Sequence, residues 1–216
     1  HEPNNEATTA QSVTLPIIVN GRVDRAGDWD VFKFNGNAGQ AVVIDVMARR
    51  LDSPLDSTLR LTDAAGRTIA ANDDNAEPGG GGLNTHHADS HISTRLPAKG
   101  SYYVHLGDTT QIGSDEHGYR LRISEPEPDF ELRVVPSSVS IRNRSSGKVS
   151  VHAVRKEGFV NPITLSIPGL PRGMSAAPVV LVGTQQVAQL TLKANWKTIN
   201  APFSVAPTVM GSAFVK

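Results

Sequence analysis

Apolar and polar residues alternate along most of the chain, which is the pattern of β-strands with one buried face. In the first part of the chain this pattern predicts strands over 15–23, 31–34, 42–46 and 119–123. The segment 41–51 is the one stretch that could form a helix, but it is rich in valine and isoleucine, so we interpret it as strand. The fold is therefore predicted to be all-β.

Two turn sequences predict β-hairpins in the first part. Asp63–Gly66 separates the strand-like runs 59–62 and 67–70. Pro97–Gly100 separates the runs 92–96 and 102–106 in the same way. We expect the two runs on either side of each turn to pair with one another.

The second part of the chain repeats this style with different turns. Its strand-like runs lie at 130–135, 148–154, 163–167 and 187–194, and the turn Gly169–Gly173 separates the last two. Strands spaced about eight to twelve residues apart over roughly 85 residues are typical of an immunoglobulin-like (Ig-like) sandwich.

The net charge of zero conceals two parts of opposite charge. Residues 1–127 contain 11 basic and 18 acidic residues, whereas residues 128–216 contain 10 basic and 3 acidic residues. The change falls at Glu125–Pro128, where alternating prolines interrupt strand pairing. We therefore predict two β-sandwich domains, 1–127 and 128–216. The second one ends soon after a strand-like segment, so we expect the chain to be cut from a longer protein.

Composition and motifs narrow the functional classes. The chain has no cysteine, so its fold needs no disulfide bonds, and it has no apolar run of 18 residues that could span a membrane. The basic second part has no arginine-rich helix and few aromatic residues, which argues against nucleic-acid binding. There is no Gly-x-Ser-x-Gly motif and no phosphate-binding glycine loop, so we predict that the chain is not an enzyme.

Several short motifs follow one another in the order found in the bacterial pre-peptidase C-terminal (PPC) domain. They lie within residues 2–124 and are Glu2-Pro3-Asn4-Asn5, Gly27-Asp28-Trp29-Asp30-Val31-Phe32, Ala38-Gly39-Gln40, Asn72-Asp73-Asp74, Asp89-Ser90 and Leu96-Pro97-Ala98-Lys99-Gly100-Ser101-Tyr102-Tyr103-Val104. Each motif is short, but the ordered set resembles this family with fair specificity.

The resemblance implies a secreted β-sandwich module of jelly-roll type, attached to a peptidase or another exported protein. The collagen-binding domains of clostridial collagenases are similar relatives, and they bind calcium. Residues 130–216 resemble the Ig-like module that follows PPC domains in large planctomycete-type exported proteins, on the pattern Gly158-Phe159, Pro162–Leu165 and Gly169–Pro171. The insertion 79–87 resembles versions of the domain found in the same proteins.

Two pairs of polar residues near the N-terminus share one spacing. Glu2 and Asn4 flank Pro3, which favours an extended segment in which residues two apart point to the same side. Asp28 and Asp30 have the same separation at the entrance to a predicted strand. Two carboxylates that face one way repel each other unless a cation or a basic residue lies between them.

The resemblance to the collagenase domains implies a calcium site formed by Glu2, Asn4, Asn5, Asp28 and Asp30. Ca²⁺ prefers carboxylate and carbonyl oxygens, which these residues supply. The alternative is that the two asparagines cap a turn while the two aspartates pair with Arg22 or Arg25.

Two further groups of polar residues are weaker candidates. Asn72, Asp73 and Asp74, together with Asp56 and Asp89, form either a second metal site or a network of turn hydrogen bonds. The segment His86–His91 places His87, Asp89 and His91 on one strand face, where zinc or another transition metal could bind. The alternative there is a polar loop that leads into a strand.

These observations favour a non-catalytic accessory or adhesion module of a larger exported bacterial protein, with a peptidase as one candidate parent and calcium as a structural ion. We expect an extracellular, cell-surface or periplasmic location, and an extracellular protein or a polysaccharide as partner. One alternative is a carbohydrate-binding module that uses the exposed face of the first sandwich, although Trp29 is expected to point inward. The other is a fragment of a metal-dependent hydrolase with its site at His86–His91.

Overall fold

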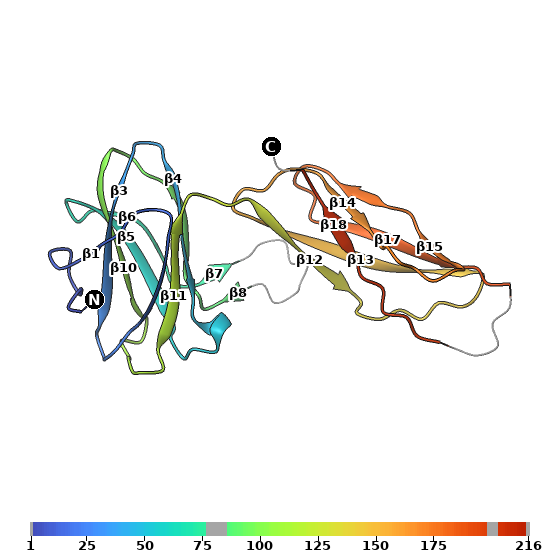
Figure 1. Cartoon of the computed structure of the whole chain (residues 1–216), viewed down its shortest axis with the longest axis horizontal. Helices are drawn as coiled ribbons and strands as arrows, with labels where there is room; N and C mark the ends of the chain where they lie inside the picture. Colours follow the sequence, from blue (N-terminus) through green and yellow to red (C-terminus); the bar gives the residue numbers. More distant parts are fainter. Residues whose placement is uncertain (1, 77–85, 198–202, 215–216) are drawn as a thin grey trace. The chain divides into compact units, whose positions relative to one another are not determined.

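The computed structural model describes residues 2–76, 86–197 and 203–214. The chain separates into two compact units, which divide between Glu127 and Pro128 (Figure 1). The division into two separate domains, 1–127 and 128–216, stays a prediction. In the described part of the chain the one helical element is the short 3₁₀ turn η1 (Arg49–Leu51), and no helix there is long and apolar enough to cross a membrane.

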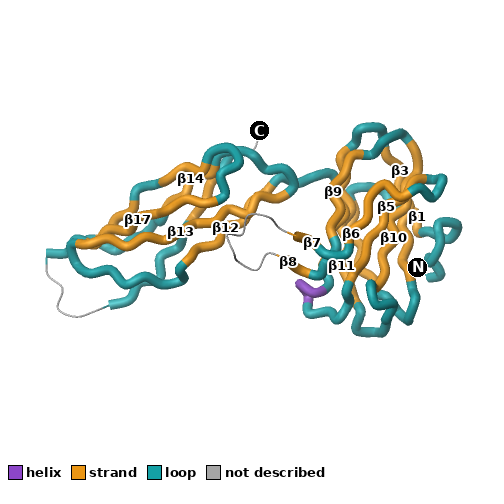
Figure 2. The backbone as a smooth tube through the Cα atoms, turned by 180° about the vertical axis from the view of Figure 1, so that it is seen from behind, coloured by secondary structure: helices purple, strands orange, loops and turns teal. Residues whose placement is uncertain are grey.

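The first unit is a sandwich of two sheets (Figure 2). The five-stranded sheet has the order β1 (Gln11–Ser12), β3 (Trp29–Gly36), β10 (Gly100–Asp108), β5 (Ser57–Asp63) and β6 (Thr68–Asn72). The four-stranded sheet has the order β2 (Ile17–Arg22), β11 (Gly118–Ser124), β4 (Ala41–Met47) and β9 (His91–Arg95). Strand β1 runs parallel to β3 and all other neighbours are antiparallel. The short strands β7 (Asn75–Ala76) and β8 (His86–His87) pair with each other.

The alternation of apolar and polar residues places every second side chain of these strands in one core. Phe32 and Val104 enter it from the five-stranded sheet, and Ile44 and Leu121 enter it from the four-stranded sheet. All four are buried. The predicted sandwich fold of this part is confirmed. The interpretation of 41–51 as strand holds for 41–47, which form β4, but is wrong for 49–51, which form the 3₁₀ turn η1.

One of the two predicted hairpins is confirmed and the other is wrong. Strands β5 and β6 pair as expected. The run 92–96, however, forms β9 and pairs with β4, whereas 102–106 belongs to β10 and pairs with β3 and β5. The turn Pro97–Gly100 therefore carries the chain from one sheet to the other. Leu96 and Tyr102 on its two sides are both buried, because each enters the core from its own sheet.

The second unit also has two sheets that share a core. One has the order β12 (Asp129–Val135), β13 (Ser145–Lys156), β17 (Val187–Ala194) and β15 (Met174–Ala176). The other has the order β16 (Val179–Leu181), β14 (Ile163–Ser166) and β18 (Met210–Ser212). Val151 and Leu190 of the first sheet and Ile163 and Leu181 of the second lie in this core. The four predicted runs of this part coincide with β12, β13, β14 and β17, while its Ig-like identity stays a prediction.

Candidate cation site at the N-terminal segment

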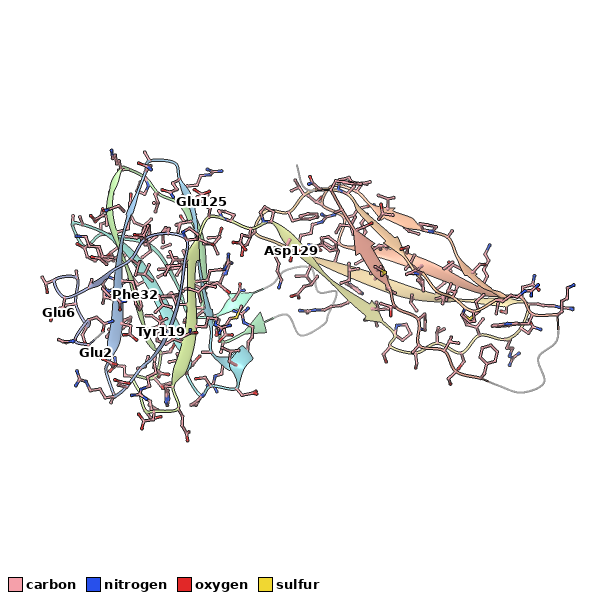
Figure 3. The ribbon with its side chains drawn as sticks, viewed as in Figure 1. Glu2, Glu6, Phe32, Tyr119, Glu125 and Asp129 are labelled. Atoms are coloured by element: carbon pink, nitrogen blue, oxygen red, sulfur yellow. The ribbon has the colours of Figure 1, made fainter. Side chains whose placement is uncertain are left out.

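The N-terminal segment lies along the edge of β3. The carbonyl oxygen of Asn4 accepts the backbone N–H of Val31 at 2.9 Å, and further along the chain β1 pairs with the same strand. Asn4 is only 2% exposed. Figure 3 shows Glu2, Phe32 and Tyr119 in the same part of the first unit. The segment is therefore positioned by its backbone as well as by its side chains.

Two buried carboxylates, those of Asp28 and Asp30, meet this segment. The side-chain amide of Asn4 donates to Oδ1 of Asp30, and that of Asn5 donates to Oδ1 of Asp28, both at 2.8 Å. The second oxygen of Asp28 accepts the backbone N–H of Asp24 at 3.0 Å. The exposed fractions of Asp28 and Asp30 are 3% and 5%, so both carboxylates depend on protein donors rather than on water.

Tyr119 connects the site to the core of the sandwich. Its hydroxyl donates to Oδ2 of Asp30 at 2.6 Å, while its ring packs among the core residues. Burial raises the pKa of Asp30, and the hydrogen bonds from Tyr119 and Asn4 oppose that rise. The negative charges of Glu2 and Asp28 raise it further. Burial and the charge of Asp30 in turn raise the pKa of Tyr119, so its hydroxyl keeps its proton and acts as the donor.

The side-chain oxygens of Asn4 and Asn5 are buried, and they accept no hydrogen bond from any residue in the described part of the chain. Each amide thus uses its NH₂ group on a carboxylate and leaves its oxygen without a partner. A buried polar atom in that state costs about 1–3 kcal/mol. Amide oxygens beside two carboxylates form a set of oxygen ligands of the kind that Ca²⁺ prefers.

The alternative in which arginines neutralise these aspartates is not what the structure shows. Arg22 pairs instead with Asp24 and, at 3.1 Å, with Asp115. No ion pair between described residues involves Asp28 or Asp30. Among the same residues there is no group of three or more His, Cys, Asp or Glu side chains that could hold a metal ion. A cation at this site would therefore need the amide oxygens as ligands.

Asp89, the buried member of the second candidate group, anchors the turn η1. It is 0% exposed and accepts the backbone N–H groups of residues 48–50 and the Nε–H of Arg50, at 2.7 to 3.2 Å. Arg50 also pairs with Asp45 at 3.1 Å, and Asp45 lies 3.2 Å from Nδ1 of His91. Burial acts to raise the pKa of Asp45, but the hydrogen bond to His91 and the charge of Arg50 outweigh it and lower that pKa.

The predicted ligand set of His87, Asp89 and His91 is not brought together by these contacts. Asp89 and His91 have different partners, and the side chain of His87 lies outside the described residues. Asp89 is therefore saturated by protein donors, which is the role of a structural anchor.

The other acidic residues of that group lie in turns. Burial, and then the charges of Asp74, Asp108 and Asp73, raise the pKa of Asp56 against an opposing effect of Arg49. The N–H of Asp74 donates to the carboxylate of Asp73 at 3.1 Å, and the N–H of Asp56 donates to that of Asp108 at 3.0 Å. These contacts support the interpretation as a network of turn hydrogen bonds.

Sequence reasoning missed Tyr119 and Asp108. Tyr119 occupies an inward position in the alternating strand β11. A buried tyrosine hydroxyl usually needs a hydrogen-bond partner, and this requirement was the one sequence signal for Tyr119. Its partner Asp30 is 89 positions away in the chain, so no local pattern could identify the pair. Asp108 is the last residue of β10 and accepts N–H groups from the turn after it, as aspartates at such positions commonly do.

Trp29 does not point into the core, contrary to expectation. It lies on the outer face of the five-stranded sheet, because the even-numbered positions of β3 face the core. A Cβ atom on Gly107 would be 3.0 Å from the Trp29 ring, so the ring packs directly on that glycine. The guanidinium of Arg60 lies 5.8 Å from the centre of the same ring, and the ammonium of Lys33 lies 5.8 Å from the ring centre of Tyr103.

Residues 28–107 match the model of a family described as the bacterial pre-peptidase C-terminal domain. The PPC resemblance is confirmed for this part of the chain. The matched PPC segment runs from the start of β3 to the end of β10 and contains both buried aspartates of the candidate site.

Two similar proteins set this segment in context. A curated relative from Deinococcus radiodurans, named "Probable subtilase-type serine protease", is 35% identical over 129 residues, which are 54% of this chain and 16% of that protein. A crystal structure of the pre-peptidase C-terminal domain of a collagenase from Bacillus anthracis is 16% identical. It covers 53% of this chain and 94% of that domain with a TM-score of 0.39. The chain thus spans a small part of the curated relative.

Removal of the Tyr119 hydroxyl tests how the carboxylate of Asp30 is stabilised. We expect Tyr119→Phe to lower the free energy of unfolding of the first unit by about 1–3 kcal/mol at neutral pH, because a buried charged oxygen loses its donor. Burial raises the pKa of Asp30 in the folded state. The carboxyl therefore ionises as the pH rises through that pKa, and the folded state then loses stability relative to the unfolded state. Below that pKa the carboxyl is protonated and loses little when the donor is removed, so the effect of the substitution should shrink as the pH falls.

Urea unfolding in the presence of a chelator, followed by the fluorescence of Trp29 in a Trp196→Phe background, measures this effect. Tyr103→Phe is the control, because Tyr103 lies on the outer face of the same unit and is not a core residue. A loss in Tyr119→Phe that does not depend on pH, or an equal loss in Tyr103→Phe, would contradict the role assigned to Tyr119.

Proposed function

We propose that the first unit is a non-catalytic accessory module of a larger exported protein, and that Ca²⁺ ties its N-terminal segment to β3. The PPC match over residues 28–107 supports the accessory role. The region shared with the subtilase-type relative is 16% of that protein, which supports a module joined to other domains. The proposed location is outside the cytoplasm: extracellular, at the cell surface or periplasmic.

One observation carries the calcium proposal: two buried, unpartnered amide oxygens lie beside two buried carboxylates that have no basic partner among the described residues. Ca²⁺ would be held by Glu2, Asn4, Asn5, Asp28 and Asp30. When bound, the ion supplies the positive charge that these oxygens lack. Isolated buried charges are costly, so neutralisation of this set favours the folded and docked state.

The protein's own residues prepare the site for such an ion. The hydrogen bond from Tyr119 opposes the rise in the pKa of Asp30 that burial causes, and the backbone N–H of Asp24 orients Asp28. The backbone bond between Asn4 and Val31 brings the asparagine side chains to the carboxylates. A terminal segment is usually disordered unless such contacts fix it. The ion therefore has a structural role in this proposal.

Calcium should raise the melting temperature of the first unit, because an ion that binds only the folded state stabilises it by about 2.7 kcal/mol at a hundredfold excess over its Kd. Thermal unfolding of residues 1–216 carrying Trp196→Phe, followed through Trp29, measures this with CaCl₂ or with a chelator. Asp28→Asn should abolish the difference between the two conditions. Asp115→Asn should preserve it, because Asp115 is an exposed carboxylate paired with Arg22.

Identical melting curves in calcium and in chelator, for protein shown to be free of metal, would rule out a stabilising calcium site. That result would leave the accessory role intact, because the role depends on the family match and not on the ion. A calcium effect that survives Asp28→Asn would instead show that the ion binds elsewhere.

Binding of an acidic polysaccharide to the outer face of the five-stranded sheet is a second candidate function. Trp29 and Tyr103 offer ring faces there, and Arg60 and Lys33 lie beside them. None of the outward positions of β3, β5 and β10 is acidic, although residues 1–127 hold 18 acidic and 11 basic residues. Burial and then the charge of Arg60 lower the pKa of His105, between these groups, to about 4. Within the described part of the chain no contact supports a hydrolase at His86–His91, because Asp89 is saturated by other donors.

Affinity electrophoresis in polygalacturonate tests this candidate. We expect the chain to be retarded by polygalacturonate and not by neutral dextran, because the face combines aromatic rings with positive charge. Arg60→Ala should weaken the retardation, whereas Arg120→Ala on the four-stranded sheet should not. If Arg60→Ala and Arg120→Ala are retarded equally by polygalacturonate, the effect comes from overall electrostatics and not from this face. If the chain is retarded as much by neutral dextran, the effect does not depend on the acidic groups of the polysaccharide.

A further inference from the structure

The second unit has an apolar slot along one side. The slot is a cavity of about 980 Å³ between two chain segments, 136–143 and 203–209, which form its walls. Its floor includes Val149 of β13 and Leu192 of β17, both of which belong to the core. At one end Asn143 closes the slot through two hydrogen bonds with the backbone of Trp196, at 2.8 and 3.0 Å.

Both walls present apolar side chains at every second position, as extended chain does. Val139 and Ile141 lie over Gly147 of β13, where an added Cβ atom would be 2.8 and 2.9 Å from them. On the opposite wall Phe203 and Val205 line the slot and are 52% and 40% exposed. The walls thus carry the alternation of apolar residues that is typical of strands, and part of their apolar surface is still accessible to a ligand.

Neither wall is paired as a strand. In the described structure β12 pairs only with β13, and β18 pairs only with β14. Within the same residues, the backbone groups of 137–141 and 203–208 form no hydrogen bond to other backbone groups. Such rows of unpaired N–H and C=O groups are templates for the addition of a strand, and in the row 203–208 only Pro207 lacks an N–H.

We propose that the slot takes one extended β-strand, supplied from outside residues 1–216, with apolar side chains at every second position. Its backbone would pair with 203–208, and its apolar side would cover the floor of the slot. This is the strand-addition mode of peptide recognition, in which main-chain bonds give affinity and pockets read alternate side chains. The wall and β18 together, 203–212, match a strand of about seven to ten residues.

The charge of the slot narrows the chemistry of this strand. Among the described residues that line it, Arg142 is the one charged side chain. The rest of the lining is apolar or carries hydroxyl and amide groups. The structure therefore favours an uncharged strand that carries one acidic residue near Arg142, since an unpaired charge elsewhere in the slot would be desolvated.

Trp196 lines the slot and reports on its occupancy, so the test uses residues 1–216 with Trp29→Phe. Four peptides of about nine residues carry valine, leucine, isoleucine or phenylalanine alternating with threonine, and end in glutamate. We expect at least one of them to give a saturable blue shift of Trp196 fluorescence. N-methylation of its alternate amides should raise the Kd at least about tenfold through loss of the main-chain bonds.

Two matched variants locate the binding. Val205→Lys puts a charge into the slot and should raise the Kd at least about tenfold. Val180→Lys is the control, because Val180 lies in β16, is 47% exposed and does not line the slot. This substitution should change the Kd less than about twofold.

Three results would overturn the proposal. If none of the four peptides shifts the fluorescence, the slot does not accept strands. If the N-methylated peptides bind as well as their parents, the ligand is recognised as apolar surface and not as a strand. If sedimentation shows a dimer without peptide that Val205→Lys dissociates, a second copy of this chain fills the slot.

Discussion

The burial of two carboxylates beside β3 is the constraint on which the N-terminal part of the first unit depends. Asp28 and Asp30 are almost fully buried, and no basic side chain in the described part of the chain pairs with them. Burial of an unpaired charge is expensive, and both carboxylates accept hydrogen bonds from protein donors. Two side-chain amides come from the N-terminal segment, and Tyr119 comes from the opposite sheet. The position of the N-terminal segment thus follows from the need to satisfy two anions.

At η1 the same unit stabilises another buried carboxylate in a different way. Asp89 is more deeply buried than Asp28, but a guanidinium and three backbone N–H groups surround it. Arg50 also reaches Asp45, whose pKa is lowered as a result of that charge and of the hydrogen bond to His91. At the N-terminal site the pKa of Asp30 is raised instead. The comparison shows that the absence of a positive charge, and not burial alone, distinguishes the site to which we assign calcium.

Sequence periodicity was sufficient for the longer strands and for the sandwich class, because the alternation of buried and exposed positions is a local property, but it did not identify the strands of two or three residues. It was insufficient for the partners of β9 and β10, since a turn such as Pro97–Gly100 fits both a hairpin and a crossing between sheets. The i, i+2 spacing did not specify which asparagine contacts which aspartate, and the structure pairs Asn4 with Asp30 and Asn5 with Asp28. Contacts such as Tyr119 to Asp30, and the unpaired walls of the slot, depend on tertiary packing and have no local signal.

The central claim is that a cation holds the N-terminal segment on β3, and the backbone N–H of Val31 reports on it most directly. That N–H is bonded to the carbonyl of Asn4 only while the segment is docked. Hydrogen exchange measured by NMR, with Val104 in the centre of β10 as a reference for global unfolding, isolates local undocking. The account predicts that calcium slows exchange at Val31 relative to Val104, and that a chelator removes this difference. Equal protection of Val31 in calcium and in chelator, in protein shown to be metal-free, would contradict it.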